Sequence, residues 1–284
     1  MKAMYFVYNP QSGSTPPLHD LKKSCKDAGL EIAKFIELDD SFRRRLARPI
    51  AMGATIIVLG GDGTINTLAN MMAGSQAVLA PLRGGTFNHF VTDLGVPQDL
   101  DEALANLKKA RVKRIDVVSV NGKYFVNNSL LGLYPYSLQI RQTIERRFGK
   151  WLSAFFAVTR AIMQFHTYRI SINGVTYCTP FVFIGNNHFG LERLGLPGRT
   201  GFDGGVMSVY IARAQNRWDI IKLSFAILVG RLKDAEEFEI LEIGRKFTAY
   251  TRRDTMRVSH DGELSRMKTP LKYELHPKSL RILS

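Results

Sequence analysis

The sequence predicts a doubly wound, Rossmann-like α/β domain followed by an antiparallel β-sandwich domain with helical insertions. In the first part of the chain, short apolar runs alternate with amphipathic stretches, the pattern of β-α-β units around a mainly parallel sheet. In the second part, strand-like segments are joined by turns such as Asn121-Gly122, and Asn-Gly is the strongest short-range hairpin signal. The 284 residues suffice for two cores. We therefore expect an α/β domain at residues 1–115 and a β domain at residues 116–284, whose last residues are able to return to the first domain.

The elements of the first domain follow from the apolar runs and from the residues that cap helices. Strands are expected at Tyr5–Tyr8, Glu31–Ile36, Thr55–Leu59 and Val78–Ala80. Helices are expected at His19–Ala28, Ser41–Met52, Ile65–Ala73 and Leu100–Ala110, the last of them after an Asp99 or Asp101 cap. The regular alternation of strand and helix favours parallel strand pairing.

The second domain reads as strands with two helical interruptions. Strands are expected at residues 114–120, 123–128, 168–172, 180–185, 206–212, 247–251, 256–259 and 271–275. The helical segments are Ser137–Phe165 and Trp218–Leu232. Antiparallel strands in this number are typical of a sandwich.

Hydropathy and cysteine usage indicate a cytoplasmic location. The longest apolar stretch, around residues 223–229, is far short of the roughly 20 residues that a membrane-spanning helix needs. The only two cysteines, Cys25 and Cys178, have no spacing that suggests a disulfide framework or a zinc site. A reducing cytosol fits both observations.

The formal net charge of +14 indicates an acidic partner. Nucleic acid, anionic lipid and nucleotide phosphate all fit this charge. Arginines and lysines gather at residues 43–48 and again at residues 141–169. Taken alone, the charge of either cluster favours a solvated face over a binding site.

The most specific local feature is the segment Leu59-Gly60-Gly61-Asp62-Gly63-Thr64, placed after an apolar strand and before a helix. Glycines let the backbone approach a ligand, and the start of a helix offers unpaired N–H groups to a phosphate. Asp62 would repel a phosphate in contact with it. We therefore expect Asp62 to orient the turn, to face a metal ion or to act on a substrate hydroxyl.

Two further turns of the same kind end neighbouring strands. Asn9-Pro10-Gln11-Ser12-Gly13-Ser14 follows the first strand, and Arg83-Gly84-Gly85-Thr86-Phe87-Asn88 follows the fourth. The carboxyl ends of the strands of an open parallel sheet line one crevice, where such folds bind nucleotides. The Arg83 guanidinium could clamp a phosphate there. The chain has no G-x-x-x-x-G-K-[ST] segment, which excludes a P-loop enzyme.

Four motifs in order give the chain a family resemblance. They are Asn9-Pro10-x-Ser12-Gly13, Gly60-Gly61-Asp62-Gly63-Thr64, Gly85-Thr86-x-Asn88 and Asp261-Gly262-Glu263. This set resembles the diacylglycerol kinase catalytic-domain family, which includes bacterial lipid kinases and the sphingosine kinases. The resemblance implies ATP and Mg²⁺ as cofactors and a lipid substrate, diacylglycerol or a related lipid, whose hydroxyl receives the γ-phosphate.

The resemblance also implies roles for particular residues. By position, the nucleotide contacts would come from Asn9, Ser12, Gly13, Gly60, Gly61, Asp62, Gly63, Thr64, Ile65, Asn66, Arg83, Gly85, Thr86 and Asn88. The catalytic base would come from the acidic motif, with Glu263 preferred to Asp261, and Asp62 is a third catalytic candidate. Without the resemblance, Asp261-Gly262 reads as a hairpin turn. Asp203 would fall near the family's secondary magnesium site.

A lipid substrate requires contact with a membrane. Residues 139–158 mix arginine and lysine with aromatic residues, so this segment could lie on an anionic bilayer as a basic amphipathic helix. Burial of its aromatic residues against the β domain is an equal alternative. We expect peripheral membrane association, no nucleic acid partner, and a homodimer as an arrangement that the resemblance allows. The competing hypotheses are an NAD kinase-like enzyme and a noncatalytic lipid- or nucleic-acid-binding protein.

Overall fold

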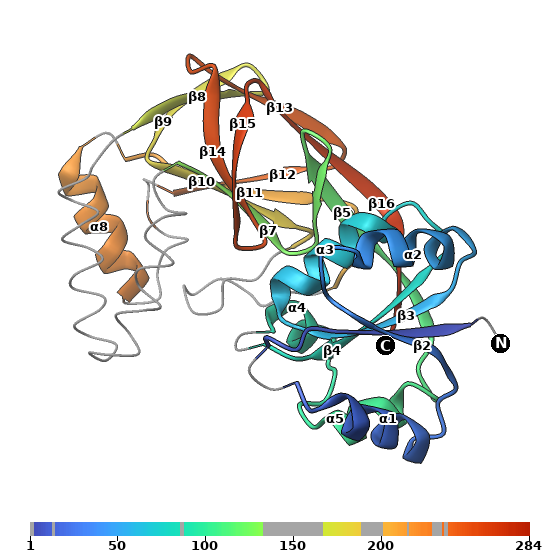
Figure 1. Cartoon of the computed structure of the whole chain (residues 1–284). Helices are drawn as coiled ribbons and strands as arrows, with labels where there is room; N and C mark the ends of the chain where they lie inside the picture. The colour runs from blue at the N-terminus through green and yellow to red at the C-terminus, as the bar shows by residue number, and fades with distance from the viewer. Residues whose placement is uncertain are drawn as a thin grey trace. The chain divides into compact units, whose positions relative to one another are not determined.

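A computed structural model describes residues 3–12, 15–85, 88–132, 167–188, 201–214, 216–228, 235 and 238–284. The chain divides into two compact units. The first comprises Met1–Val117, Tyr124–Val126 and His276–Ser284, and the second comprises Val118–Lys123 and Asn127–Leu275. Strands β5 (Val112–Val120) and β16 (Leu271–Leu283) each run from one unit into the other (Figure 1).

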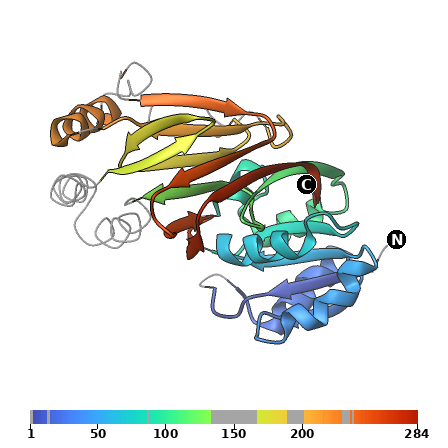
Figure 2. The same ribbon diagram turned by 90° about the horizontal axis from the view of Figure 1, so that it is seen from above.

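A parallel sheet forms the centre of the first unit. Its strands follow the order β2 (Ile32–Glu37), β1 (Met4–Tyr8), β3 (Thr55–Gly60) and β4 (Val78–Arg83), and the end of β16 pairs in parallel with β4. Helices α1 (Leu18–Asp27) and α5 (Leu100–Asn106) lie over one face, and α2 (Phe42–Ala51) and α3 (Asp62–Met72) lie over the other (Figure 1). The short helix α4 (His89–Asp93) follows β4. Figure 2 gives a second view of this sheet, with the blue and cyan helices beside its strands.

Burial on both faces explains how this sheet is held between its helices. Every residue of β3 is buried. On the α1 side, Leu21 and Leu104 belong to one buried cluster with Phe6 and Ile57. Such burial stabilises the unit by roughly 1.5–3 kcal/mol for each large apolar side chain. The core therefore fixes the strand ends, where the polar turns lie.

Antiparallel strands form the second unit. One sheet has the order β12 (Phe238–Ile243), β11 (Met207–Ala212), β10 (Phe181–Asn186), β7 (Asn128–Gly132), β14 (Thr255–His260) and β15 (Glu263–Lys268). The other strands follow the order β16, β13 (Lys246–Thr251), β8 (Tyr168–Ile172) and β9 (Val175–Thr179). The Ser129 hydroxyl of β7 lies 3.0 Å from the Tyr273 hydroxyl of β16, and both side chains are buried. Helix α8 (Arg217–Leu228) packs through Leu223 against Ala212 and Ala214, and β6 (Lys123–Phe125) pairs with β5.

The prediction of a mixed α/β part and an antiparallel β part is confirmed, with differences at several elements. Helix α3 begins at Asp62 and not at Ile65, because Gly61 caps the helix with an extended backbone. Helix α5 ends at Asn106, before the expected Ala110. The strand expected at residues 123–128 is divided between β6 and β7, and β9, β12 and β15 were not predicted.

Two predictions on helices fall partly or wholly outside the described residues. The basic segment at 139–158 and the helix Ser137–Phe165 lie outside them, as do residues 229–232 of the helix expected at Trp218–Leu232. Within the described part of the chain, no helix combines the length and the apolar character needed to cross a membrane.

Candidate functional site

Three polar turns lie side by side at one edge of the first unit's sheet. They follow β1, β3 and β4, which are parallel neighbours in register, because Tyr8 pairs with Leu59 and Gly60 pairs with Arg83. The Asn9 N–H donates to the carbonyl of Leu59 at 3.2 Å. The structure thus brings together the strand ends that carry most of the predicted nucleotide contacts.

The turns after β3 and β4 approach each other through their backbones. The Gly84 N–H donates to the Gly60 carbonyl at 3.1 Å, and a Cβ atom on Gly84 would lie 2.6 Å from the Gly60 nitrogen. A Cβ atom on Gly85 would lie 2.5 Å from the Gly61 Cα. A side chain at Gly84 or Gly85 would therefore force the two backbones apart. Because glycine has no side chain, this backbone can also approach a phosphate closely.

Helix α3 begins inside the glycine-rich segment. Gly61 is its N-cap, and Asp62 is its first residue. The negative charge of Asp62 is favourable there because the helix dipole is positive at its N-terminus. Among the residues that the structure describes, Asp62 Oδ1 is buried and has no hydrogen-bond partner. This oxygen fits a substrate hydroxyl or a cation that accompanies a phosphate, two of the roles that the sequence left open.

Asn88 fixes the turn after β4. Its backbone adopts the left-handed conformation, with φ 50° and ψ 40°. Its Oδ1 accepts the Gly85 N–H at 2.9 Å, and its Nδ2 donates to the Gly85 carbonyl at 2.5 Å. The side chain is almost fully buried. Asn88 therefore fixes the conformation of the Gly85 backbone at this edge of the sheet.

Asn9 and Arg83 are also anchored by the fold. Asn9 Oδ1 accepts the Gln11 N–H at 3.0 Å, and the Asn9 carbonyl accepts the Ser12 N–H at 3.1 Å, which closes the turn after β1. Arg83 Nε donates to the Val96 carbonyl at 2.8 Å. The guanidinium is thus oriented through Nε, and a phosphate would be bound through its terminal nitrogens.

Ile65 and Asn66 have structural contacts that the sequence did not reveal. Ile65 is fully buried, and its N–H donates within the helix to Gly61 at 3.1 Å, so its side chain belongs to the core. The carbonyl and Oδ1 of Asn66 accept Asn70 Nδ2 at 2.9 and 3.0 Å. The Thr64 side chain packs against Gly60. Two predicted contacts, Gly13 and Thr86, lie outside the described residues.

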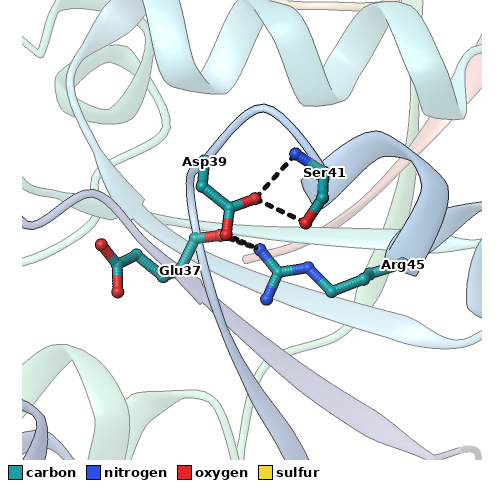
Figure 3. A network of polar contacts seen from close by, with 4 residues as sticks. All are labelled: Glu37, Asp39, Ser41 and Arg45. Carbon is teal, nitrogen blue, oxygen red and sulfur yellow. Dashed lines mark hydrogen bonds and ion pairs between the residues drawn. The ribbon is translucent and has the colours of Figure 1, made fainter.

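A fourth polar turn, between β2 and α2, lies at the same sheet edge and was not predicted. Asp39 Oδ1 accepts both the N–H and the hydroxyl of Ser41 at 2.8 Å, and Asp39 Oδ2 lies 2.6 Å from Arg45 Nη2 (Figure 3). The same nitrogen donates to the Glu37 carbonyl at 2.7 Å. The hydrogen bonds from Ser41, with the Arg45 charge, hold the pKa of Asp39 below its ordinary value. Arg45 therefore serves the turn and is not a free member of the arginine cluster.

The predicted acidic motif lies in the second unit, at the turn between β14 and β15. Asp261 and Gly262 both have positive φ, 45° and 86°, as a two-residue hairpin turn requires. Asp261 Oδ1 accepts the N–H groups of Asn127 and Asn128, each at 2.9 Å. Glu263, the first residue of β15, is exposed. The two carboxylates thus differ, because one is bound to backbone and the other faces solvent.

A buried histidine beside this turn was not predicted as a site residue. His260 is 3% exposed, and its Nε2 lies 3.1 Å from the Ser265 hydroxyl, which accepts Lys123 Nζ at 3.0 Å. Within the described residues, His260 Nδ1 has no hydrogen-bond partner. Burial, with the Lys123 charge as a second cause, lowers the pKa of His260 to about 4. The imidazole is therefore neutral at pH 7.

Asp203 precedes β11 and is exposed. Magnesium usually keeps several water ligands and is bound through one or two carboxylates together with phosphate oxygens. Asp203 is the one carboxylate in residues 201–214, and no group of three or more His, Cys, Asp or Glu residues suited to a metal is present in the described part of the chain. The magnesium site that the resemblance implies near Asp203 therefore stays a prediction, with Asp203 as its one carboxylate among these residues.

Comparisons with known sequences point to one family. The family profile described as "Diacylglycerol kinase catalytic domain" matches residues 3–120. Two proteins named "Putative lipid kinase", from Staphylococcus aureus strains MRSA252 and MSSA476, are each 30% identical over 246 residues, which is 81% of this chain and 76% of theirs. The match therefore extends well beyond the first unit.

Solved structures show the same fold. A crystal structure titled as a putative diacylglycerol kinase from Bacillus anthracis str. Sterne superposes with a TM-score of 0.76 at 24% identity, covering 99% of this chain and 97% of that one. A second structure, titled as a diacylglycerol kinase of the same organism, superposes with a TM-score of 0.70 at 21% identity, covering 99% and 96%. At these identities the likeness shows the fold alone.

Proposed function

The chain belongs to the diacylglycerol kinase catalytic-domain family of lipid kinases, and from this we propose that it transfers the γ-phosphate of ATP to the hydroxyl of a lipid, diacylglycerol or a related one. The observation that carries the proposal is the edge where the turns after β1, β3 and β4 lie side by side. Bare glycine backbone and the start of α3 supply N–H groups suited to phosphate oxygens. In this proposal the first unit is the doubly wound ATP-binding domain, and the second is the sandwich that binds lipid.

Residue roles follow from the state of each carboxylate. We assign the proton acceptor to Glu263, because it is exposed while Asp261 Oδ1 is occupied by two backbone N–H groups. The lipid hydroxyl oxygen attacks the γ-phosphorus of ATP, and the hydroxyl proton passes to Glu263. The bond between the γ-phosphorus and the oxygen that bridges it to the β-phosphate breaks, and ADP leaves with that oxygen. Asp62 Oδ1 is available to a cation bound with the nucleotide. Mg²⁺, when bound, would neutralise phosphate charge.

The test is transfer of labelled γ-phosphate from ATP with Mg²⁺ to a panel of diacylglycerol, sphingosine, phosphatidylglycerol and NAD. We expect a labelled lipid, and we expect its loss in Glu263→Gln. Label that appears only in NAD would identify an NAD kinase-like enzyme. No transfer to any acceptor, together with salt-dependent binding to lipid or DNA, would identify a noncatalytic binding protein.

A further inference from the structure

The hairpin of β14 and β15 has one outward face that carries only uncharged and basic residues. Register places Thr255 and Arg257 on the same face as their direct partners, Lys268 and Arg266. The next pair on this face is Ser259, which is buried, and Leu264, which is exposed. The residues between them, such as Met256, Val258 and Met267, are buried on the opposite face. We call Arg257, Leu264, Arg266 and Lys268 the basic hairpin face. All four are exposed, and β15 is the edge strand of its sheet.

Two arginines of this face are directly opposite each other. Arg257 pairs with Arg266 across the strands, and like charges at such positions are destabilising. Arg266 Nε donates to the Thr255 hydroxyl at 2.9 Å, which is an uncharged partner. In the part of the chain that the structure describes, none of the three cations has an ion-pair partner. The face therefore concentrates positive charge that an external anion would stabilise.

An apolar side chain lies within the same face. Leu264 is 42% exposed and is two residues from Arg266 on one strand. Free phosphate and a nucleic acid backbone provide no apolar contact for leucine. At the boundary between lipid headgroups and acyl chains, cations contact the headgroups while leucine is buried among the chains. Charge complementarity and the exposed leucine together favour a lipid surface.

We propose that the basic hairpin face binds the surface of an anionic lipid bilayer. This inference rests on the proposed function, because a lipid kinase must meet its substrate at a membrane. The turn at the end of the hairpin carries Asp261 and Glu263, so docking of this face would hold the acidic motif close to the bilayer.

The test is sedimentation of the full chain with vesicles of phosphatidylglycerol and phosphatidylcholine, without ATP. Arg257→Gln/Arg266→Gln is compared with Arg43→Gln/Arg44→Gln, which removes the same charge from two exposed arginines of α2. Each basic residue near an anionic surface contributes about 1 kcal/mol, so the hairpin pair should lower vesicle affinity about 30-fold. The α2 pair should lower it less than about threefold. Thermal unfolding of both variants is the check that each of them is folded.

Leu264→Gln distinguishes a bilayer from other polyanions. It should weaken binding to vesicles while binding to heparin and to duplex DNA stays unchanged. If the hairpin and α2 variants lost equal amounts of vesicle affinity, net charge alone would explain the binding, and the proposal would be overturned. Tighter binding to DNA than to vesicles at the same salt concentration, through the same arginines, would overturn it in favour of nucleic acid.

A kinase assay with a short-chain, water-soluble diacylglycerol separates this proposal from the proposed function. The hairpin variants should phosphorylate it like wild type, since docking is not needed there. An active wild type that does not bind anionic vesicles would refute the docking surface alone. A protein that binds vesicles through this face but phosphorylates no lipid would support the docking surface and refute the kinase.

Discussion

Asp261 and Asn128 hold each other by reciprocal hydrogen bonds. The Asp261 N–H donates to the Asn128 carbonyl at 2.9 Å, and the Asn128 N–H donates to Asp261 Oδ1 at 2.9 Å. Asn127 adds a second N–H to the same carboxylate oxygen. This contact joins the hairpin turn to the start of β7, 133 residues earlier in the chain. Asp261 therefore serves the structure of the turn, whatever its part in chemistry.

Asp261→Asn is expected to keep most of the stability of the protein. Asparagine retains an Oδ1 that can accept both N–H groups, and it tolerates the left-handed backbone at this position. Asp261→Ala leaves two donors without that acceptor and should lower the free energy of unfolding by about 1–3 kcal/mol. Urea denaturation measures both changes. If Asp261→Asn abolished phosphate transfer while the protein stayed folded, Asp261 and not Glu263 would be the base.

Glu263→Gln is expected to reduce kcat by about 10²–10⁴-fold, the usual contribution of a general base. Glu263 is exposed, so the substitution should leave the melting temperature unchanged. Glu274→Gln provides the matched control, because it makes the same chemical change at an exposed position of β16. Steady-state transfer of labelled phosphate to diacylglycerol measures the effect. Equal rates in the two variants would remove Glu263 from the mechanism.

Gly84→Ala is expected to destabilise the first unit by about 1–3 kcal/mol or more. Its new Cβ atom would lie 2.6 Å from the Gly60 backbone nitrogen, which cannot move without separating two core strands. Gly61→Ala is the control, because its Cβ atom would have its nearest contact at 3.5 Å and its φ is −78°. That variant should lose only about 1 kcal/mol, the cost of alanine at an N-cap. Similar losses in both variants would show that the close approach is not what requires glycine at Gly84.

Patterns within short stretches of sequence were enough to predict the polar edge of the first sheet. Contacts between residues far apart in the sequence could not be predicted in this way. The buried strand β3 and its glycine-rich turn are continuous in sequence, so their pattern was visible. Strand β15 was missed because Met267 is its one buried residue, and charged residues such as Glu263, Arg266 and Lys268 leave no apolar alternation. The β2–α2 network depends on Arg45 reaching back to a backbone carbonyl, which no residue pattern reveals. The hydrogen bonds between Asp261 and Asn128 join segments far apart in the chain, and a single sequence contains no signal for such a pair.

Stability is expected to fall below about pH 6.5 because of His260. Its pKa is lowered from 6.5 to about 4 by burial and by Lys123, so the unfolded chain binds a proton that the folded protein excludes. Stability is therefore fully present above the unfolded pKa and is lost as the pH falls toward the folded pKa. Between pH 7 and pH 5, the loss attributable to this group is about 2 kcal/mol. The measurement is urea denaturation at both pH values.

The control for this prediction is His260→Gln, which keeps a polar side chain that can bond to Ser265 but does not titrate in this range. The variant should be less stable than wild type at pH 7, since the buried ring is lost from the hairpin core. Between pH 7 and pH 5, however, its free energy of unfolding should fall by about 2 kcal/mol less than that of wild type. Other groups titrate in both proteins alike, so the difference between their pH profiles isolates His260. Parallel profiles for wild type and variant would show that the imidazole has an ordinary pKa in the folded protein.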